Sequence, residues 1–553
     1  MSLRLTSVGF VPEDTARVAR AAFPKGSAWL LLRDELGTIF TDAAFASLFP
    51  RRGQPAEAPW RLALVTLLQY AENLSDRQAA NAVRSRIDWK YLLGLELTDA
   101  GFDNSVLSEF RSRLLAGGAE EQLLQCLLQR CKEKRLLRAR GRQRTDSTHV
   151  LSRVRTLNRL EGVGETLRAA LNVLALAHPE WIRSHAPPEW MERYSTRVDD
   201  YNLPKGDAAR RAYAEVIGRD GHHLLDLLSA ADAPAGLRML PAVEVLRQVW
   251  VQQFYRVGES VRWRTAEEGI PLASIFINSP YDVESRYARK RSTTWTGYKV
   301  HLTEVCEEAA PHLITHVQTT IAPATDASAL EPMHQALQEK EVLPSRHLVD
   351  ASYVDAQTLV RSQGTYQVDL LGPAPGDGRW QAKAGKGFDA AHFTLDWDAK
   401  KATCPTGKQS VEWGSARDGG GHPVVRIKFA RRDCGSCAHR SDCTRSAHAP
   451  RAILVREKDE YLALQAARAR QAEADFRTEY GRRAGVEGTL SQGVRAFHLR
   501  QARYIGLAKT HLQHVATAGA INLVRLAAWL MGEEPAKTRQ STFVRLMAQP
   551  GYA

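Results

Sequence analysis

Hydrophobic side chains recur every three or four positions over the first 136 residues, a period that predicts helices. The periodic segments span residues 29–36, 60–72, 77–92 and 106–115. Ser75 and Gln78 have the spacing of a capping box, and Asp103-Asn104-Ser105 supplies N-cap residues before the last segment. We therefore expect an all-helical N-terminal domain over residues 1–136.

Arg111 and Arg113 fall on the last of these helices, which follows a tight turn. This helix could be the second helix of a helix-turn-helix that reads DNA, with both arginines as contacts. The alternative is an ordinary helical bundle with a polar outer face. The formal net charge of +13 favours DNA contact, because a basic chain attracts an acidic partner.

The period changes at residues 143–154, QRTDSTHVLSRV, which are rich in β-branched side chains and predict a strand. Asp146 lies near its centre or end. A buried carboxylate is costly unless it binds a metal or is paired, so Asp146 is a candidate functional residue. The alternative is that Asp146 caps a local turn with Ser147 and Thr148.

Helical periodicity returns after residue 157 and, interrupted by prolines, continues to about residue 263. We expect a helical insertion over residues 157–284, since this segment is too long for a loop. His222, His223 and Asp226 lie there on a leucine-rich helix, which favours a packing role over a metal site.

Strand patterns resume at residues 296–304 and 313–322, and an apolar strand at 347–354 contains Asp350. Helices are expected between and after these strands. The alternation predicts a mixed sheet with helices on its faces, built from residues 137–156, 285–375 and 458–532. Reactive groups gather at the carboxyl ends of strands in such sheets, which favours Asp350 over Asp355 and Asp369 as a functional acid.

A second insertion, residues 376–457, has little helical pattern and contains four clustered cysteines: Cys404, Cys434, Cys437 and Cys443. One C-x-x-C pair and two further cysteines could form a tetrahedral zinc site, with His439 and His448 as alternative ligands. The alternative is a set of free thiols in a packed loop. With seven cysteines in all and no signal-peptide pattern, we expect a reducing, cytoplasmic setting. No run of eighteen apolar residues predicts a membrane span.

The stretch YGRRAGVEGTL places Tyr480, Arg483 and Glu487 on one helix face. Gly485 and Gly488 disfavour a helix, but they would allow close approach by a bulky ligand. The alternative is a solvated helix with an Arg–Glu pair. A helix without a long break is expected from residue 496 to 530, with a basic stripe that includes Arg495, Arg500 and Arg503, and residues 533–553 form a frayed tail.

Two strand aspartates and one helix glutamate would make a hard, oxygen-rich site that suits Mg²⁺ or Mn²⁺. Two such ions activate an attacking oxygen and stabilise the leaving oxygen in phosphoryl transfer. No Walker lysine loop follows a strand here, so the energy source would be a phosphodiester and not ATP.

The chain resembles insertion-sequence transposases of the DDE type, and within them family 1182 of the group with the Y-x-x-R-x-x-x-E signature. TDST around Asp146, LVDASYVD around Asp350 and YGRRAGVE ending in Glu487 carry the resemblance. GYKVHL, CPTGK, CGSC and QARYIGLAKTHLQ extend it over most of the chain. One position departs from the family, which has a basic residue seven positions after the glutamate where this chain has Val494.

The resemblance implies an RNase H-like fold with Asp146, Asp350 and Glu487 as catalytic, metal-binding residues for two ions. It also implies a bacterial, nucleoid-associated protein that binds double-stranded DNA at terminal inverted repeats as a homodimer and joins a freed 3′-hydroxyl to target DNA. Tyr480 and Arg483 would hold phosphates near the cut. Further candidates for backbone contact are Lys299, Arg495, Arg500 and Arg503, and for stacking on a flipped base Trp380, Trp397 and Trp413.

Two other functions fit the same residues. One is an RNase H-like nuclease or resolvase that cuts DNA without strand transfer. The other is a non-catalytic DNA-binding protein descended from a transposase, against which the intact acids count.

Overall fold

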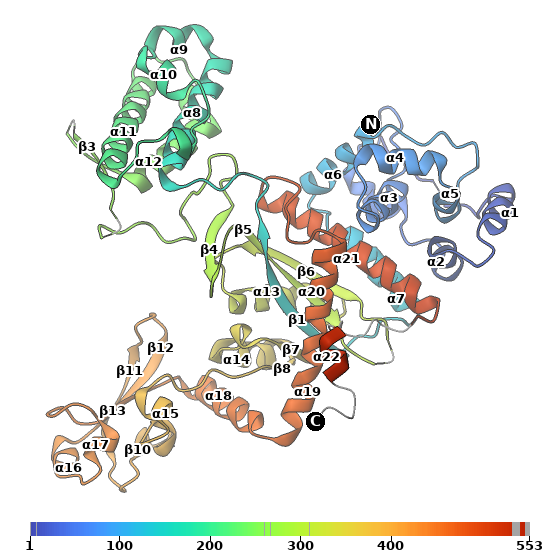
Figure 1. The fold of residues 1–553 in the computed structure, drawn as a ribbon. Coiled ribbons are helices and arrows are strands. Elements are labelled where there is room, and N and C mark those ends of the chain that lie inside the picture. The colour runs from blue at the N-terminus through green and yellow to red at the C-terminus, as the bar shows by residue number, and fades with distance from the viewer. Residues whose placement is uncertain are drawn as a thin grey trace.

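The computed structural model describes residues 2–6, 8–258, 260–265, 267–308, 310–533 and 542–547. A central α/β core carries the N-terminal helices on one side, and two further bodies project from it in different directions (Figure 1). One is the helical insertion, in teal and green, and the other is the cysteine-containing insertion, in orange. The predicted mixed α/β architecture is confirmed.

The first 136 residues are helical, as predicted. The capping box of Ser75 and Gln78 is present, with Gln78 N–H donating to Ser75 Oγ and Ser75 N–H donating to Gln78 Oε1. The elements are α1 (Glu13–Ala22), α2 (Ala28–Leu36), η1 (Asp42–Leu48), α3 (Pro59–Ala71), α4 (Asp76–Ser85), α5 (Ile87–Leu93), α6 (Ser105–Ala116) and α7 (Gln122–Glu133).

The central sheet has the strand order β4-β5-β1-β7-β8, and β6 also pairs with β5. Strand β5 runs antiparallel to β1, whereas β7 runs parallel to β1 and β8 parallel to β7. The strands are β1 (Arg142–Leu151), β4 (Arg286–Lys290), β5 (Thr293–Val305), β6 (Ile314–Ile321), β7 (Arg346–Val349) and β8 (Asp369–Leu371). Every residue of β5 from Trp295 to Val305 is buried, because both faces of this strand are covered.

Helices cover the sheet and join it to the N-terminal helices. The central one is α21 (Leu507–Leu530), which packs against α3 and β6. One continuous hydrophobic core therefore contains the N-terminal helices, the sheet and α21. The other helices of this part are α13 (Asp326–Glu339), η4 (Ala351–Tyr353), α14 (Ala356–Tyr366), α18 (Lys458–Gln471), α19 (Ala474–Gly481), η6 (Arg482–Ala484) and α20 (Gly485–Ala496).

The expectation of a helix without a long break from residue 496 to 530 was wrong. Helix α20 ends at Ala496 and α21 begins only at Leu507. His498 and Gly506 have φ values of 52° and 94°, in the left-handed region that a right-handed helix cannot contain. Between them, Gln501 forms a bridge with Leu151, so this segment is held against the end of β1. Of the predicted tail, the structure describes α22 (Thr542–Met547), and residues 534–541 and 548–553 lie outside the described part.

The helical insertion has a hydrophobic core of its own. It consists of α8 (Arg159–Ala177), α9 (Pro179–His185), α10 (Glu189–Tyr194), η2 (Asp200–Asn202), α11 (Asp207–Ser229), η3 (Leu237–Met239) and α12 (Pro241–Gln253). Its end differs from the prediction, because β2 (Phe254–Val257) and β3 (Ser260–Trp263) form a hairpin there. His223 packs edge-on against Trp190 and Asp226 pairs with Arg256, which supports the packing role.

The cysteine-containing insertion is the smallest body, and six residues form its buried core. It consists of α15 (Trp380–Ala384), η5 (Ala390–His392), β9 (Thr394–Asp396), β10 (Lys401–Thr403), β11 (Ser410–Arg417), β12 (Pro423–Phe429), α16 (Arg431–Gly435), α17 (Arg440–Cys443) and β13 (Ala452–Val455). None of the described helices in the chain is long and apolar enough to cross a membrane.

Candidate active site

Asp146 and Asp350 are neighbours across two parallel strands. The register of β1 and β7 ends with Thr145 opposite Val349. The next residues are Asp146, within β1, and Asp350, which directly follows the end of β7 and caps η4. Adjacent strands are about 4.8 Å apart, so the two aspartates are neighbours at the carboxyl end of β7. Asp146 Oδ1 accepts the Ser147 N–H at 2.8 Å, and Asp350 Oδ1 accepts the Ala351 N–H at 2.7 Å.

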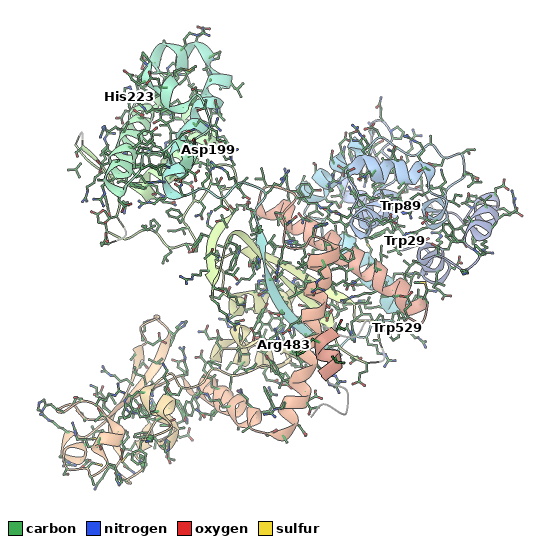
Figure 2. The ribbon with its side chains drawn as sticks, viewed as in Figure 1. Trp29, Trp89, Asp199, His223, Arg483 and Trp529 are labelled. Carbon is green, nitrogen blue, oxygen red and sulfur yellow. The ribbon has the colours of Figure 1, made fainter. Side chains whose placement is uncertain are left out.

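Arg483 connects Asp146 to Glu487. Its Nη2 donates to Asp146 Oδ2 at 2.7 Å, and its Nη1 donates to Glu487 Oε1 at 3.1 Å. Arg483 lies in η6, between α19 and α20 (Figure 2). Its side chain reaches Asp146 in β1 of the central sheet. Acids from three distant parts of the sequence therefore lie around this guanidinium. Asp350 is the third, and its negative charge helps to raise the pKa of Arg483.

The charges of these groups influence one another. Burial raises the pKa of Asp146, and the nearby Asp350 raises it further, while Arg483 and the Ser147 N–H oppose the shift. Burial disfavours the charged form of Arg483, but the surrounding acids and Tyr480 outweigh it and raise its pKa. Tyr480 is half-buried and stacks on Phe476, and burial together with the three acids raises the pKa of its phenol. Tyr480, Arg483 and the three acids thus form one electrostatic cluster.

A buried ion network fixes α20, the helix that carries Glu487. Glu304 is fully buried and accepts hydrogen bonds from Arg144 Nε at 2.7 Å, Arg525 Nη1 at 2.8 Å and Thr489 Oγ1 at 2.5 Å. Arg144 Nη1 also donates to the carbonyl of Arg482 at 2.6 Å. Strands β1 and β5 are thereby bonded directly to η6 and α20.

This network explains why residue 485 is a glycine, and the reason differs from the expected close approach of a bulky ligand. A Cβ at Gly485 would lie 2.1 Å from Arg144 Nη1, so the glycine admits the protein's own arginine and not a ligand. At Gly488 a Cβ would meet nothing within 4 Å. Both glycines are helical, because tertiary contacts override their low helix propensity.

The donor set of Asp146, Asp350 and Glu487 fits a hard cation such as Mg²⁺, since all its atoms are carboxylate oxygens. The described side chains do not, however, form a closed metal site: among them no group of three or more His, Cys, Asp or Glu is arranged to hold an ion. The three acids do not form a closed site because the guanidinium of Arg483 lies between two of them, Asp146 and Glu487.

Two predicted DNA contacts are occupied inside the protein. Lys299 is 9% exposed, and its Nζ donates to Asp326 Oδ1 at 2.8 Å and to the Ala324 carbonyl. Arg111 is 7% exposed and forms a two-bond pair with Asp76. Lys299 thus neutralises the buried carboxylate of Asp326, and Arg111 pairs with the partly exposed carboxylate of Asp76. Both cations are engaged within the protein, and their role as DNA contacts stays a prediction.

The other predicted basic contacts differ in how they are held. Arg495 is exposed, and Arg500 is exposed while its Nε donates to Thr148 Oγ1 at 2.8 Å. Arg503 lies 4.7 Å above the ring of Tyr70. Arg113 lies 5.0 Å above the ring of Phe49. Arg495 and Arg500 are consequently the most accessible of the set.

The four clustered cysteines line one pocket of the small insertion. Cys404 Sγ accepts the Lys408 N–H at 3.3 Å and Cys434 Sγ accepts the Arg451 N–H at 3.5 Å. Burial raises the pKa of the Cys443 thiol, and the other three cysteines raise it further. The sulfurs therefore face a common space, although they do not form a closed metal site in the described residues.

The tryptophans of this insertion contact other side chains. Trp397 packs edge-on against Trp413 and also contacts Tyr461, while Trp380 lies beneath Arg445.

Sequence reasoning did not identify Arg144, Glu304 or Asp326, although all three lie in or beside the predicted sheet. The available signal was a pair of opposite charges, Arg144 and Glu304, in two of the predicted strands, which the fold pairs directly opposite each other.

Comparison with protein families gives two matches. Residues 17–113 match the family described as Transposase domain (DUF772), and residues 403–527 match the family described as Transposase DDE domain. The second match contains Tyr480, Arg483 and Glu487 but neither aspartate. No curated protein and no solved structure matches the chain. The two family matches support an insertion-sequence DDE transposase.

Proposed function

We propose that this chain is a transposase of insertion-sequence family 1182, with an RNase H-like core in which Asp146, Asp350 and Glu487 are the catalytic acids. The single observation that carries the proposal is their convergence: the β1–β7 register places the two aspartates side by side, and Arg483 bonds both Asp146 and Glu487. Their order along the chain is that of the DDE signature.

The three carboxylates would hold Mg²⁺ or Mn²⁺, as two ions. When bound, such ions supply Lewis-acid activation of the attacking oxygen and stabilisation of the leaving oxygen. The protein itself holds the acids in fixed positions. Asp146 and Asp350 each accept a backbone N–H, and the Glu304 network holds α20. This rigidity keeps the acids in place while a phosphodiester is cut and rejoined.

The DNA partner would be double-stranded, with terminal inverted repeats bound by a homodimer and target DNA entering the same site. Arg483 and Tyr480 would contact the phosphate that reacts, and their position beside the acids supports this role. Exposed Arg495 and Arg500 follow on the C-terminal side of Glu487 and would contact the backbone beyond it. The N-terminal helices would bind the repeats through surfaces other than buried Arg111.

We also propose one structural Zn²⁺ on Cys404, Cys434, Cys437 and Cys443. Four thiols around one pocket are a donor set that zinc prefers. The small hydrophobic core of this insertion supports the proposal, because small domains commonly need a metal or disulfides to be stable.

The proposal is tested by strand transfer with the purified full chain. The substrate is the DNA that flanks the gene, searched for short inverted repeats, supplied as a pre-cut end with a circular target and Mg²⁺. We expect joining of the end to the circle, its loss with a chelator, and its loss in Asp146→Asn. Asp355→Asn is the matched control, because Asp355 only caps α14 and Asn caps equally well. Cutting without joining would favour a nuclease or resolvase, and binding without cutting a non-catalytic descendant.

A further inference from the structure

Asp326 is a fourth carboxylate beside the acid cluster, and it is 5% exposed. It is the first residue of α13, where the N-terminal end of a helix favours negative charge. Lys299 Nζ lies 2.8 Å from Asp326 Oδ1, and Lys290 Nζ lies 3.8 Å from Asp326 Oδ2. Burial works against its charge, but the hydrogen bond and charge of Lys299 lower the pKa of Asp326, so it is ionised.

The remaining bonds of Asp326 come from two serines. Ser147 Oγ donates to Oδ1 at 3.2 Å, and Ser352 Oγ donates to Oδ2 at 2.8 Å. Ser147 directly follows Asp146, and Ser352 is two residues after Asp350. One buried carboxylate therefore bonds both segments that carry the paired aspartates.

We propose that Asp326 is a positioning residue that fixes the separation of Asp146 and Asp350 through Ser147 and Ser352. The inference rests on the proposed function, since it gives those aspartates a metal-binding role. Strand β7 pairs with β1 only as far as Val349, so no ladder bond holds Asp350 against Asp146. The two serine bonds supply that missing cross-link at the point where the strands diverge.

Asp326 acts through the serines and not as a ligand itself. Both of its oxygens are already engaged, one by Lys299 and Ser147 and the other by Ser352. Its buried pair with Lys299 supplies a fixed anchor, because removing either charge would leave the other uncompensated. The serine hydroxyls can be removed without disturbing that pair, which makes them the better positions for a test.

The test compares the double variant Ser147→Ala/Ser352→Ala with Ser328→Ala, an exposed serine in the first turn of α13. Three quantities are measured on the full chain: Mn²⁺ affinity by electron paramagnetic resonance, the rate constant for cleavage of an element end, and the melting temperature. We expect the double variant to lose about 10-fold to 100-fold in both Mn²⁺ affinity and cleavage rate, because small displacements of reacting groups are costly. Its melting temperature should stay close to that of Ser328→Ala.

Asp326→Asn in the double-variant background supplies a second check. If Asp326 acts through the serines, adding this change should lower Mn²⁺ affinity by less than about threefold, whereas the same change in the wild type should lower it as much as the double variant does. A double variant with the Mn²⁺ affinity and cleavage rate of Ser328→Ala would overturn the positioning role and leave the proposed function standing. A wild-type chain that neither binds Mn²⁺ nor cleaves DNA would overturn the proposed function itself.

Discussion

Arg483 Nη2 lies 2.7 Å from Asp146 Oδ2, and the same guanidinium reaches Glu487 at 3.1 Å. An internal cation thus neutralises two acids that come from opposite ends of the core sequence. The guanidinium also occupies the space between Asp146 and Glu487, where an ion bound by both carboxylates would lie. Under the proposed function, Arg483 must turn toward a DNA phosphate before Asp146 and Glu487 can hold metal together.

Arg483→Gln should therefore separate metal binding from catalysis. Without the competing guanidinium, we expect the free protein to bind Mn²⁺ about tenfold more tightly, while cleavage of an element end falls at least tenfold because the phosphate contact is lost. Mn²⁺ affinity is measured by electron paramagnetic resonance on the DNA-free chain. Arg495→Gln, an exposed arginine on the same helix as Glu487, is the control and should leave Mn²⁺ affinity unchanged. Weaker Mn²⁺ binding in Arg483→Gln would contradict this account.

Two glycines three residues apart should respond oppositely to alanine. Gly485→Ala should lower the melting temperature and the cleavage rate, since its Cβ would displace Arg144 from the network that anchors α20. Gly488→Ala has open space and should stabilise the helix by up to about 1 kcal/mol. Thermal melting of the two variants side by side checks both. Equal effects would mean that Arg144 does not constrain the helix start.

His334 should make the stability of the folded protein depend on pH in the acidic range. Its ring is buried and contacts His347, and burial lowers the pKa of His334 to about 4. The folded state therefore disfavours protonation, so the stability that the neutral ring contributes is present above about pH 6.5 and is lost as the pH falls toward 4. We expect His334→Gln to melt below the wild type at pH 7.5, and the gap to narrow by pH 4.5. A gap that stays constant across this range would be inconsistent with a buried neutral ring.

The cysteine pocket gives a prediction about metal content. The purified chain should contain about one zinc per molecule, and Cys437→Ser should lose most of it and become sensitive to proteolysis within residues 376–457. Cys126→Ser, in α7, is the control and should retain the metal. Elemental analysis and limited proteolysis measure these outcomes. A zinc-free wild type with an intact insertion would show that the cysteines are packed thiols.

Much of the architecture could be predicted from local patterns. The helices of the first 136 residues, the strand with Asp146 and the strand before Asp350 follow from periodicity and capping residues. The break at His498 and the hairpin at Phe254–Trp263 could not be predicted, because they depend on tertiary contacts such as the bridge between Leu151 and Gln501.

The candidate site, like the fold, could be predicted from the sequence only in part. The spacing of Tyr480, Arg483 and Glu487 indicated a shared face, but only the three-dimensional structure pairs Arg483 with Asp146, 337 residues away. Lys299 and Arg111 look like DNA contacts in the sequence, whereas the fold pairs Lys299 with the buried Asp326 and Arg111 with the partly exposed Asp76. A basic residue by itself does not reveal whether its partner is a phosphate or a carboxylate of the same chain.

The central claim is that Asp146, Asp350 and Glu487 hold the catalytic ions, and metal rescue of Asp350→Cys tests it most directly. A thiolate binds Mg²⁺ poorly but accepts softer ions. We predict that this variant joins a pre-cut end at least 100-fold more slowly than the wild type in Mg²⁺ and regains at least tenfold in Mn²⁺, while Asp355→Cys behaves as the wild type in both. Wild-type joining by Asp350→Cys in Mg²⁺ would contradict the claim.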